Sequence, residues 1–533
     1  MTALTGTGNL VRLALRLDRV KLSIWVALLT MLTVSTASAF EGLYPTAAER
    51  VAFGQTIAAN PAFRGLLGAV YDASSIGGLT AWRVAVILGV LGGLMGHQTV
   101  VRNTRAEEEA GRLELVGAGV VGRHAPLTAA LLVAFGAGAL TGGATAGALI
   151  GLGEDVAGSV AFGAGVTGII WVFAAVGAVA AQLTTTSRAA NSIAGAAVGA
   201  AFLLRAVGDT LGDEGAAWPS WASPIGWLQQ IRPFADERWW VLGLMIATVA
   251  ALLSLAHVMV ARRDVDAGLF PARPGHARAG PGLDSPVGLA WRLQRGTLVG
   301  WTVAVAVWSA VIGAVAESAG DLLQGNAQLE QILAALGGAE DLIDSYLAAV
   351  MSILGLAAAA FAAVAALRLR SEEVALRAEP MLATGVRRGS WASSHLVFAI
   401  AGPAVLLLVA GLTMGVVHGL QMDDVATQVP RLIGAALVQL PAAWVFAAIA
   451  MLLFGAVPRA STAVWAALVA CLLIGQLGSV LQLDQWVLDL SPFTHVPQLP
   501  GGELTWTPLL WLTALALALT VAGMAGLSRR DVG

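Results

Sequence analysis

Long apolar stretches dominate this chain, and short polar or charged segments separate them. Most of the stretches reach the roughly 20 residues that a helix needs to cross a bilayer. Their apolar character is continuous, which favours membrane-spanning helices over the one-sided helices of a water-soluble protein. Twelve transmembrane helices are predicted, at about residues 22–40, 82–101, 125–151, 157–183, 189–207, 239–261, 297–316, 347–368, 392–419, 431–456, 460–481 and 506–527. The expected fold is an all-α polytopic membrane protein.

The composition agrees with this interpretation. Charged residues make up 12% of the chain and hydrophobic residues 57%, whereas a soluble protein has roughly 25% charged residues. The 63 glycines predict spans that pack closely through small residues.

Basic residues lie mostly in alternate connections between the predicted spans. The positive-inside rule therefore places the two termini and the segments rich in arginine in the cytoplasm. The chain is expected to cross the plasma membrane several times, with both of its ends inside the cell. Arg205, near the outer end of a span, is expected to reach the outer interface rather than to stay buried.

The polar segment before the first span, residues 8–21, has the pattern of an amphipathic helix. Arg12, Arg16 and Arg19 share one helical face, and Leu13, Leu17 and Val20 share the adjacent one. Such a helix lies on the inner leaflet, with its cations near anionic lipid head groups. An ordinary basic flank of the first span is the alternative. The matching segment Leu289–Trp301, which repeats the pattern of Leu13–Trp25, favours the interfacial helix.

A charged segment after the second span recurs in the second half of the chain. Arg105–Arg123 reads RAEEEAGRLELVGAGVVGR, and Arg370–Arg388 reads RSEEVALRAEPMLATGVRR. Both contain the pattern RxEExxxRxE, at an offset of 265 residues. The positive-inside rule requires arginine but no glutamate at matched positions. The recurrence therefore predicts two cytoplasmic helices, one in each half, that contact a soluble partner. Glu108–Arg112 and Glu373–Arg377 are expected to be bracing pairs four residues apart.

These repeats divide the chain into two tandem halves. The halves are residues 1–263 and 286–533, each with six predicted spans, an amphipathic interfacial helix and a charged cytoplasmic helix. Their ends also correspond, because Arg262–Val265 matches Arg529–Val532. Residues 264–285, rich in Pro, Gly and Arg, are predicted to form a cytoplasmic linker. The loops at 41–80 and 317–345 show helical periodicity, which predicts short external helices.

The sequence offers little for covalent chemistry. Cys471 is the only cysteine, which excludes an internal disulfide and a thiolate metal cluster. The seven histidines show no metal-binding spacing such as HExxH. A P-loop needs a lysine after glycine, but the only lysine, Lys21, follows Val20. The chain is therefore predicted to be no enzyme and to bind no metal or cofactor itself.

Two other classes remain open from the residues alone. A proton-coupled secondary transporter of the major-facilitator type would also have twelve spans and a central linker. It needs ionisable groups inside the membrane to bind the coupling ion, and carboxylates are scarce in the predicted spans. A polytopic enzyme such as a lipid-linked glycosyltransferase needs a carboxylate or metal cluster at a membrane face. The only tight pair on a short outer loop is Asp423-Asp424.

The order of elements in each half resembles that of type-2 ATP-binding-cassette (ABC) exporter permeases. An interfacial helix, a span, an external segment, a second span and the charged helix RxEExxxRxE follow one another. The chain is especially similar to the fused actinobacterial permeases described as exporters of polyketide antibiotics (tetronasin-type multidrug efflux permeases). The similarity covers nearly the whole chain, including the stretches YPTAAER and SSIGGLTAWR around Tyr44 and Ser74.

This resemblance implies a permease for antibiotic and multidrug efflux that works with a homodimer of a soluble P-loop ATPase. ATP and Mg would bind to that partner, the cargo would be hydrophobic or amphipathic, and no nucleic acid would be involved. The charged segments would be the coupling helices that seat in the ATPase. The implied coupling residues are Arg105, Glu107, Glu108, Arg112, Glu114, Arg370, Glu372, Glu373, Arg377 and Glu379.

Two further expectations follow from the resemblance. The cargo cavity would be lined from the second and fifth spans of each half, with His97, Asn191, Met351 and Gln476 as candidates. The two ATPase contacts are expected to be inequivalent, because Pro380 stands where the first copy has Leu115.

Overall fold

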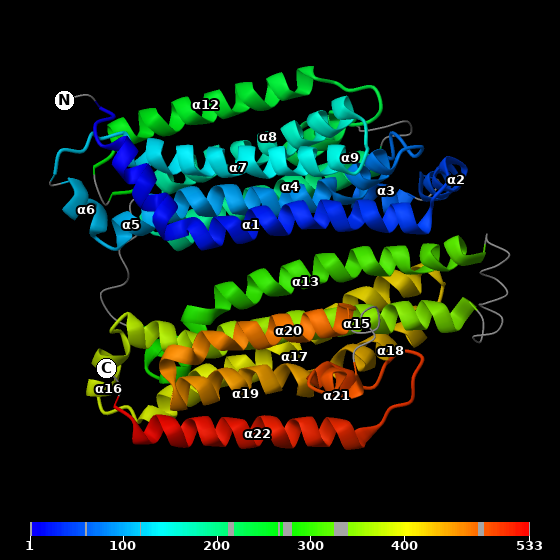
Figure 1. The fold of residues 1–533 in the computed structure, drawn as a ribbon. Coiled ribbons are helices and arrows are strands. Elements are labelled where there is room, and N and C mark those ends of the chain that lie inside the picture. The colour runs from blue at the N-terminus through cyan, green and yellow to red at the C-terminus, as the bar shows by residue number, and fades with distance from the viewer. Residues whose placement is uncertain are drawn as a thin grey trace. The chain divides into compact units, whose positions relative to one another are not determined.

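The computed structural model describes residues 3–58, 61–117, 119–211, 218–264, 267–269, 280–324, 339–477 and 484–531. In these ranges the chain forms helices and connecting segments, and no strand. Two compact units divide the chain, Met1–Pro274 and Gly275–Gly533. Figure 1 draws the first unit from blue to green and the second from green to red. The division falls inside residues 264–285, the segment expected to be a linker.

The helices of the first unit are α1 (Thr7–Leu43), α2 (Ala47–Ala58), α3 (Pro61–Leu67), α4 (Ile76–Asn103), α5 (Arg105–Glu109), α6 (Arg112–Gly117), α7 (Ala125–Gly151), α8 (Val156–Leu183), α9 (Ser187–Leu211), α10 (Trp218–Trp221), α11 (Pro224–Gln230) and α12 (Trp240–Arg262).

Those of the second unit are η1 (Pro281–Leu283), α13 (Pro286–Gln324), α15 (Ala339–Val374), α16 (Ala378–Ala383), α17 (Arg388–Gln421), α18 (Val425–Leu437), α19 (Leu440–Ala456), η2 (Pro458–Ala463), α20 (Val464–Leu477), α21 (Gln485–Leu488), η3 (Pro492–His495) and α22 (Trp506–Arg529).

Eleven helical segments in the described part of the chain are long and apolar enough to cross a membrane, with α18 and α19 counting as one. This confirms the all-α polytopic fold. The span predicted at 460–481 coincides with η2 and α20, and its end lies outside the described residues. The layout with twelve spans therefore stays a prediction.

The amphipathic segment before the first span is not a separate helix. It is continuous with that span in α1, and α13 joins the corresponding elements in the second unit. Between Gly8 and Gly42 the sequence contains neither glycine nor proline, so nothing in α1 interrupts the helical hydrogen bonds. Figure 1 shows the first turns of α1 at an angle to the rest. The predicted apolar face of this segment is exposed, as Leu17 at 60% illustrates.

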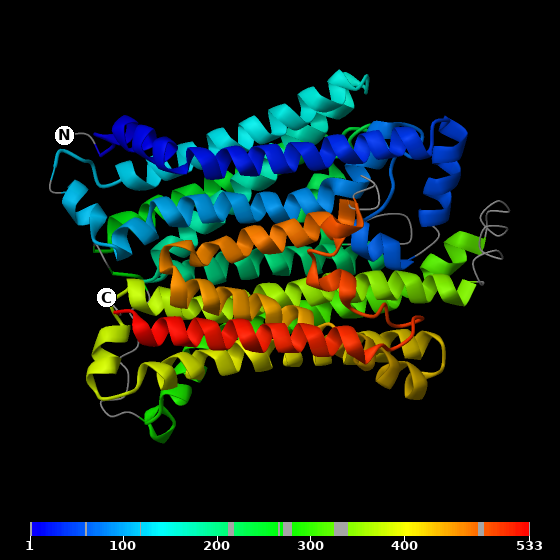
Figure 2. The same ribbon diagram turned by 60° about the horizontal axis from the view of Figure 1, so that its bottom comes forward.

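The two units pack their spans by the same scheme. In the first unit α8 packs against α4, α7 and α12, and in the second unit α19 packs against α15, α17 and α22. Figure 2 shows these helices from a second direction. The fourth long helix therefore lies at the centre of each unit. Aromatic side chains fill the cores, such as Phe162 and Phe173 in the first unit and Phe361 and Phe446 in the second.

Glycine allows the closest helix crossings. A methyl group on Gly142 of α7 would overlap the carbonyl oxygen of Gly163 in α8, and one on Gly455 of α19 would overlap that of Gly523 in α22. These contacts agree with close packing through small residues, as the composition predicted.

Short external helices were predicted after the first span, and α2 and α3 lie there. The carbonyl groups at the end of α3 accept hydrogen bonds from side chains of other helices. Arg205 of α9 donates to the carbonyls of Gly65 and Leu66 over 2.8 and 3.0 Å, and Trp82 of α4 donates to Gly68 over 2.9 Å. These donors satisfy groups that a helix end leaves unpaired.

Arg205 is fully buried, so the prediction that it reaches the outer interface was wrong. Its guanidinium also pairs with Asp209 over 3.2 Å, and Asp209 accepts a hydrogen bond from Ser220. The side chain stays inside because two carbonyls and a carboxylate replace the water it would otherwise bind.

Candidate functional site

The charged segments lie at one end of each unit, which we call its charged end. In the first unit it contains α5, α6 and the N-terminus, and in the second it contains α16 and the C-terminus (Figure 1). The sequence pattern predicted one charged helix per half. Each copy instead forms a helical segment, a turn and a second short helix.

The turn has the same backbone form in both copies, although its residue differs. Gly111 separates α5 from α6 with φ of +69°, and Leu376, at the equivalent position 265 residues later, has φ of +56° between α15 and α16. A side chain in this left-handed region strains the backbone. Strain of this kind is often found at functional sites. The left-handed conformation gives the chain the same change of direction in both copies.

Glu108 is the centre of a buried Arg–Glu–Arg cluster, which we call the first triad. Its carboxylate is 2% exposed and lies 3.1 Å from the guanidinium of Arg105. Arg263, directly after α12, binds both carboxylate oxygens over 2.7 and 2.9 Å. Arg105 also donates to the carbonyl of Ala181 in α8 over 2.9 Å, and Arg263 donates to the Gln182 side chain over 2.7 Å. α5 and the ends of α8 and α12 therefore meet around one carboxylate.

The second unit repeats this arrangement around Glu373, in what we call the second triad. The carboxylate of Glu373 is 4% exposed and accepts two hydrogen bonds from Arg530, after α22, over 2.7 and 3.0 Å. The guanidinium of Arg370 lies 3.4 Å from the same carboxylate. The guanidinium of Arg530 also lies 4.7 Å from the ring centre of Phe454 in α19, a cation–π contact. Phe454 thus takes the role that Gln182 has in the first unit.

The remaining glutamates pair differently from the prediction. Glu108 and Glu373 do not pair with Arg112 and Arg377, because the turn redirects the chain between them. Arg112 binds Glu107 with two hydrogen bonds of 2.7 Å each, and Arg377 binds Glu372 over 2.7 Å. The bond to Glu107 raises the pKa of the Arg112 guanidinium, so this ion pair stays charged at any physiological pH.

Only part of the ten candidate coupling residues faces outward. Arg112, Glu114, Arg377 and Glu379 are exposed, whereas Arg105, Glu108, Glu372 and Glu373 are buried. Large apolar side chains lie beside the exposed ones, with Leu115 at 79%, Val374 at 64% and Leu376 at 61% exposed. This mixture of exposed charge and apolar surface is suited to contact with another protein.

Sequence reasoning missed Arg263 and Arg530 as site residues. The signal was present, because Arg262–Val265 matches Arg529–Val532. The match indicated only that the halves end alike, since a sequence cannot show which helix a terminal arginine reaches.

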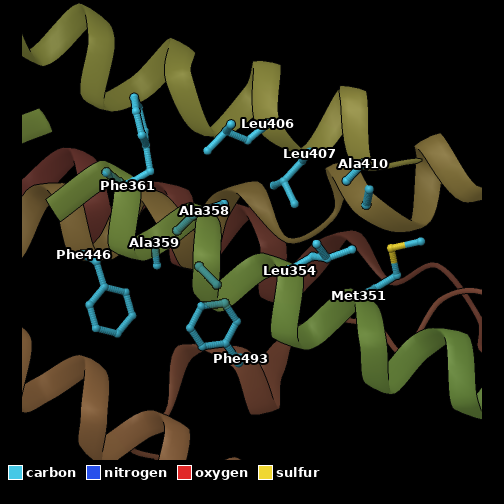
Figure 3. Packing of buried hydrophobic residues seen from close by; sticks show 14 of the residues in the cluster. Met351, Leu354, Ala358, Ala359, Phe361, Leu406, Leu407, Ala410, Phe446 and Phe493 are labelled. Atoms are coloured by element: carbon cyan, nitrogen blue, oxygen red, sulfur yellow. The ribbon is translucent and has the colours of Figure 1, made fainter. Parts of the chain in front are cut away.

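Two of the four candidate cavity residues lie in each unit. His97 is 2% exposed, on α4, and Gly177 of α8 packs against its backbone. Asn191 of α9 is its neighbour. Met351 is buried in the core of the second unit (Figure 3). Gln476 belongs to α20, but its side chain lies outside the described residues.

A cavity of about 230 Å³ lies close to Met351, toward the end of the second unit opposite its charged end. Ser352 and Leu356 of α15, Cys471 of α20, and Phe493 of η3 line it, together with Gln439. The carbonyl oxygen of the Gln439 side chain has no hydrogen-bond partner, although the residue is only 3% exposed. In the described part of the chain, no group of three or more acidic, histidine or cysteine residues could hold a metal ion.

The sequence was compared with known proteins. The family described as multidrug efflux system permease Rv1217c, C-terminal domain, matches residues 8–260 and 283–527. The multidrug efflux system permease protein Rv1217c of Mycobacterium tuberculosis (strain ATCC 25618 / H37Rv) is 45% identical over 539 residues. The alignment covers 99% of this chain and 95% of the relative.

Proposed function

Because this chain belongs to the family of the multidrug efflux system permease Rv1217c, we propose that it is the permease of an ABC exporter whose ATPase is a separate subunit. Its proposed cargo is hydrophobic or amphipathic compounds, including antibiotics. The single observation that carries the proposal is the pair of matched, exposed charged segments at the charged ends of the two units. We place these ends and both termini in the cytoplasm of the bacterial cell, since most basic residues lie on this side.

The charged segments have the properties of a docking surface for an ATPase. Glu114 and Glu379 occupy equivalent exposed positions and have an exposed arginine close by in sequence. Alternating charges orient a partner and set which partners bind, while the neighbouring Leu115 and Val374 provide apolar contact area. Two such surfaces fit a homodimeric P-loop ATPase, which would bind ATP and Mg. Closure of this dimer would move both charged segments and drive alternating access.

A proton-coupled mechanism has less support. All five buried carboxylates among the described residues have an arginine partner: Asp18 pairs with Arg102, Glu108 with Arg105, Asp209 with Arg205, Glu372 with Arg368 and Glu373 with Arg370. A carboxylate that carries a proton through the membrane has to lose and regain it in each cycle. The arginine next to each of these carboxylates attracts the charged form and so opposes protonation, while burial acts in the opposite direction.

We propose that the cavity in the second unit contacts the cargo. Its wall combines apolar side chains such as Leu356 and Phe493 with the unpaired carbonyl oxygen of Gln439. A buried acceptor without a partner costs about 1–3 kcal/mol, and a donor group on an amphipathic molecule would recover part of that cost. The cavity therefore favours apolar compounds that carry an N–H or O–H group.

Copurification with the ATPase tests the proposal. The full chain is expressed together with the P-loop ATPase encoded nearest to it, and the complex is isolated through a tag on the permease. We expect the ATPase to copurify and Glu114→Arg combined with Glu379→Arg to abolish its binding, because both changes reverse exposed charges. Arg262→Met, at an exposed position on the same side, is the matched control. Failure of any P-loop ATPase to bind the unaltered permease would contradict the proposed function.

A further inference from the structure

We infer that the two triads are mechanical joints, which pass the movement of each charged segment to the last span of the same unit. This inference rests on the proposed function, because the movement comes from an ATPase partner. Arg263 and Arg530 are then positioning residues that touch neither nucleotide nor cargo. Their role is to make α12 and α22 follow the charged segments.

The first argument is geometric. Arg263 is the residue directly after α12, and it binds both oxygens of Glu108. A bidentate pair between a guanidinium and a carboxylate fixes direction as well as distance. Arg105 extends the joint to α8 through the carbonyl of Ala181. A displacement of α5 therefore pulls on two further spans through short, oriented bonds.

The second argument is that the same long-range contact occurs in both units. Glu108 and Arg263 are separated by 155 residues, and Glu373 and Arg530 by 157. The same three residue types form both triads although the surrounding sequences differ, for example at Glu109 and Val374. Arg123 and Arg388, also equivalent, donate to the backbone carbonyls of Arg263 and Arg530 respectively. The three charged residues of the joint are thus repeated, together with the arginine that binds the backbone of its last member, whereas Gln182 and Phe454 differ.

The third argument concerns the choice of charged residues. Buried ion pairs contribute less to stability than well-packed apolar side chains often would, because desolvation offsets their attraction. A purely structural contact between α5 and α12 could thus be apolar. An ion pair with a fixed orientation is better suited to keep two helices in register while they move.

Amide hydrogen exchange of the permease–ATPase complex tests the inference. The complex is compared without nucleotide and with ATP plus orthovanadate, which traps the closed ATPase. In the unaltered complex we expect exchange to change in α5–α6 and in the last turns of α12. In Arg263→Gln the ATPase should still bind, the change in α5–α6 should persist, and the change in α12 should be lost. Arg530→Gln should have the same effect on α22.

Control variants separate a joint from a structural contact. Arg262→Gln and Arg529→Gln alter exposed neighbouring arginines and should leave the exchange pattern unchanged. If Arg263→Gln does not assemble, Arg263→Lys keeps the charge, loses the bidentate geometry and should weaken the response.

The outcomes distinguish the two proposals. If no ATPase binds, or if trapped nucleotide leaves α5–α6 unchanged, the proposed function fails. A second outcome is that trapped nucleotide changes exchange in α5–α6 and changes exchange in α12 equally in the unaltered chain and in Arg263→Gln or Arg263→Lys. In that case the proposed function stands and the joint is refuted.

Discussion

Replacing Arg205 by methionine should strongly destabilise the first unit. The guanidinium is fully buried and holds Asp209 of its own helix and the carbonyls of Gly65 and Leu66 at the end of α3. Methionine fills part of the volume but donates no hydrogen bond. Asp209 would remain as a buried charge without a cation, and two helix-end carbonyls would lose their donor.

The structure sets the size of the effect. Breaking a buried ion pair by removing one partner costs about 3–5 kcal/mol. A unit of this size loses about 2–4 °C of Tm per kcal/mol, so the apparent Tm should fall by about 6–20 °C. Adding Asp209→Asn removes the unpaired charge and should recover about 1 kcal/mol or more, since contacting residues couple by this amount.

The assay is thermal unfolding of the purified, detergent-solubilised chain at one heating rate, because such unfolding is usually irreversible. Arg262→Met, an exposed arginine on α12, should change stability by less than about 0.5 kcal/mol. If Arg205→Met melts like the control, Arg205 does not hold α3 to α9. If the double variant is no more stable than Arg205→Met, the buried charge is not the source of the loss.

Three further predictions use single positions. Gly142→Ala should lower the apparent Tm, because the new methyl group overlaps Gly163. Gly143→Ala, with open space around it, should leave the apparent Tm unchanged. An equal Tm in the two variants would contradict the tight crossing of α7 and α8. Gly111→Ala should raise the rate of amide hydrogen exchange in α6 about fivefold or more, because a backbone φ of +69° costs an L-residue about 1–2 kcal/mol. An unchanged exchange rate would argue against the left-handed turn. Cys471, the sole cysteine, lines the cavity of the second unit and should react with a small maleimide. If rhodamine 6G is transported, it should slow this reaction in the unaltered chain and slow it less in Gln439→Leu. A dye that is transported without slowing the labelling would exclude this cavity as its site.

The sequence predicted the fold well because its signals are local. A bilayer requires long apolar stretches, and these are visible one residue after another. The same locality explains the continuous helix α1, where the sequence contains no breaking residue between Gly8 and Gly42; the predicted boundary followed the change in polarity, which does not end a helix.

The site was harder to predict because its contacts join distant segments. RxEExxxRxE marked the segments that form the two triads. Spacing along one helix suggested the pair Glu108–Arg112, but the turn at Gly111 redirects the chain between these residues. Glu108 instead meets Arg263, 155 residues away. Arg205 was misjudged for a similar reason, since its partners Gly65 and Leu66 offer backbone oxygens that no sequence pattern reveals.

The different neighbours of the two triads have an evolutionary consequence. Gln182 supports Arg263, whereas Phe454 stacks on Arg530. A permease assembled from two identical copies would have to use one residue at both positions, so any substitution would change both sides together. Covalent fusion removes this constraint, and a substitution at Gln182 or Phe454 can tune one side of the molecule while the other keeps its ancestral behaviour.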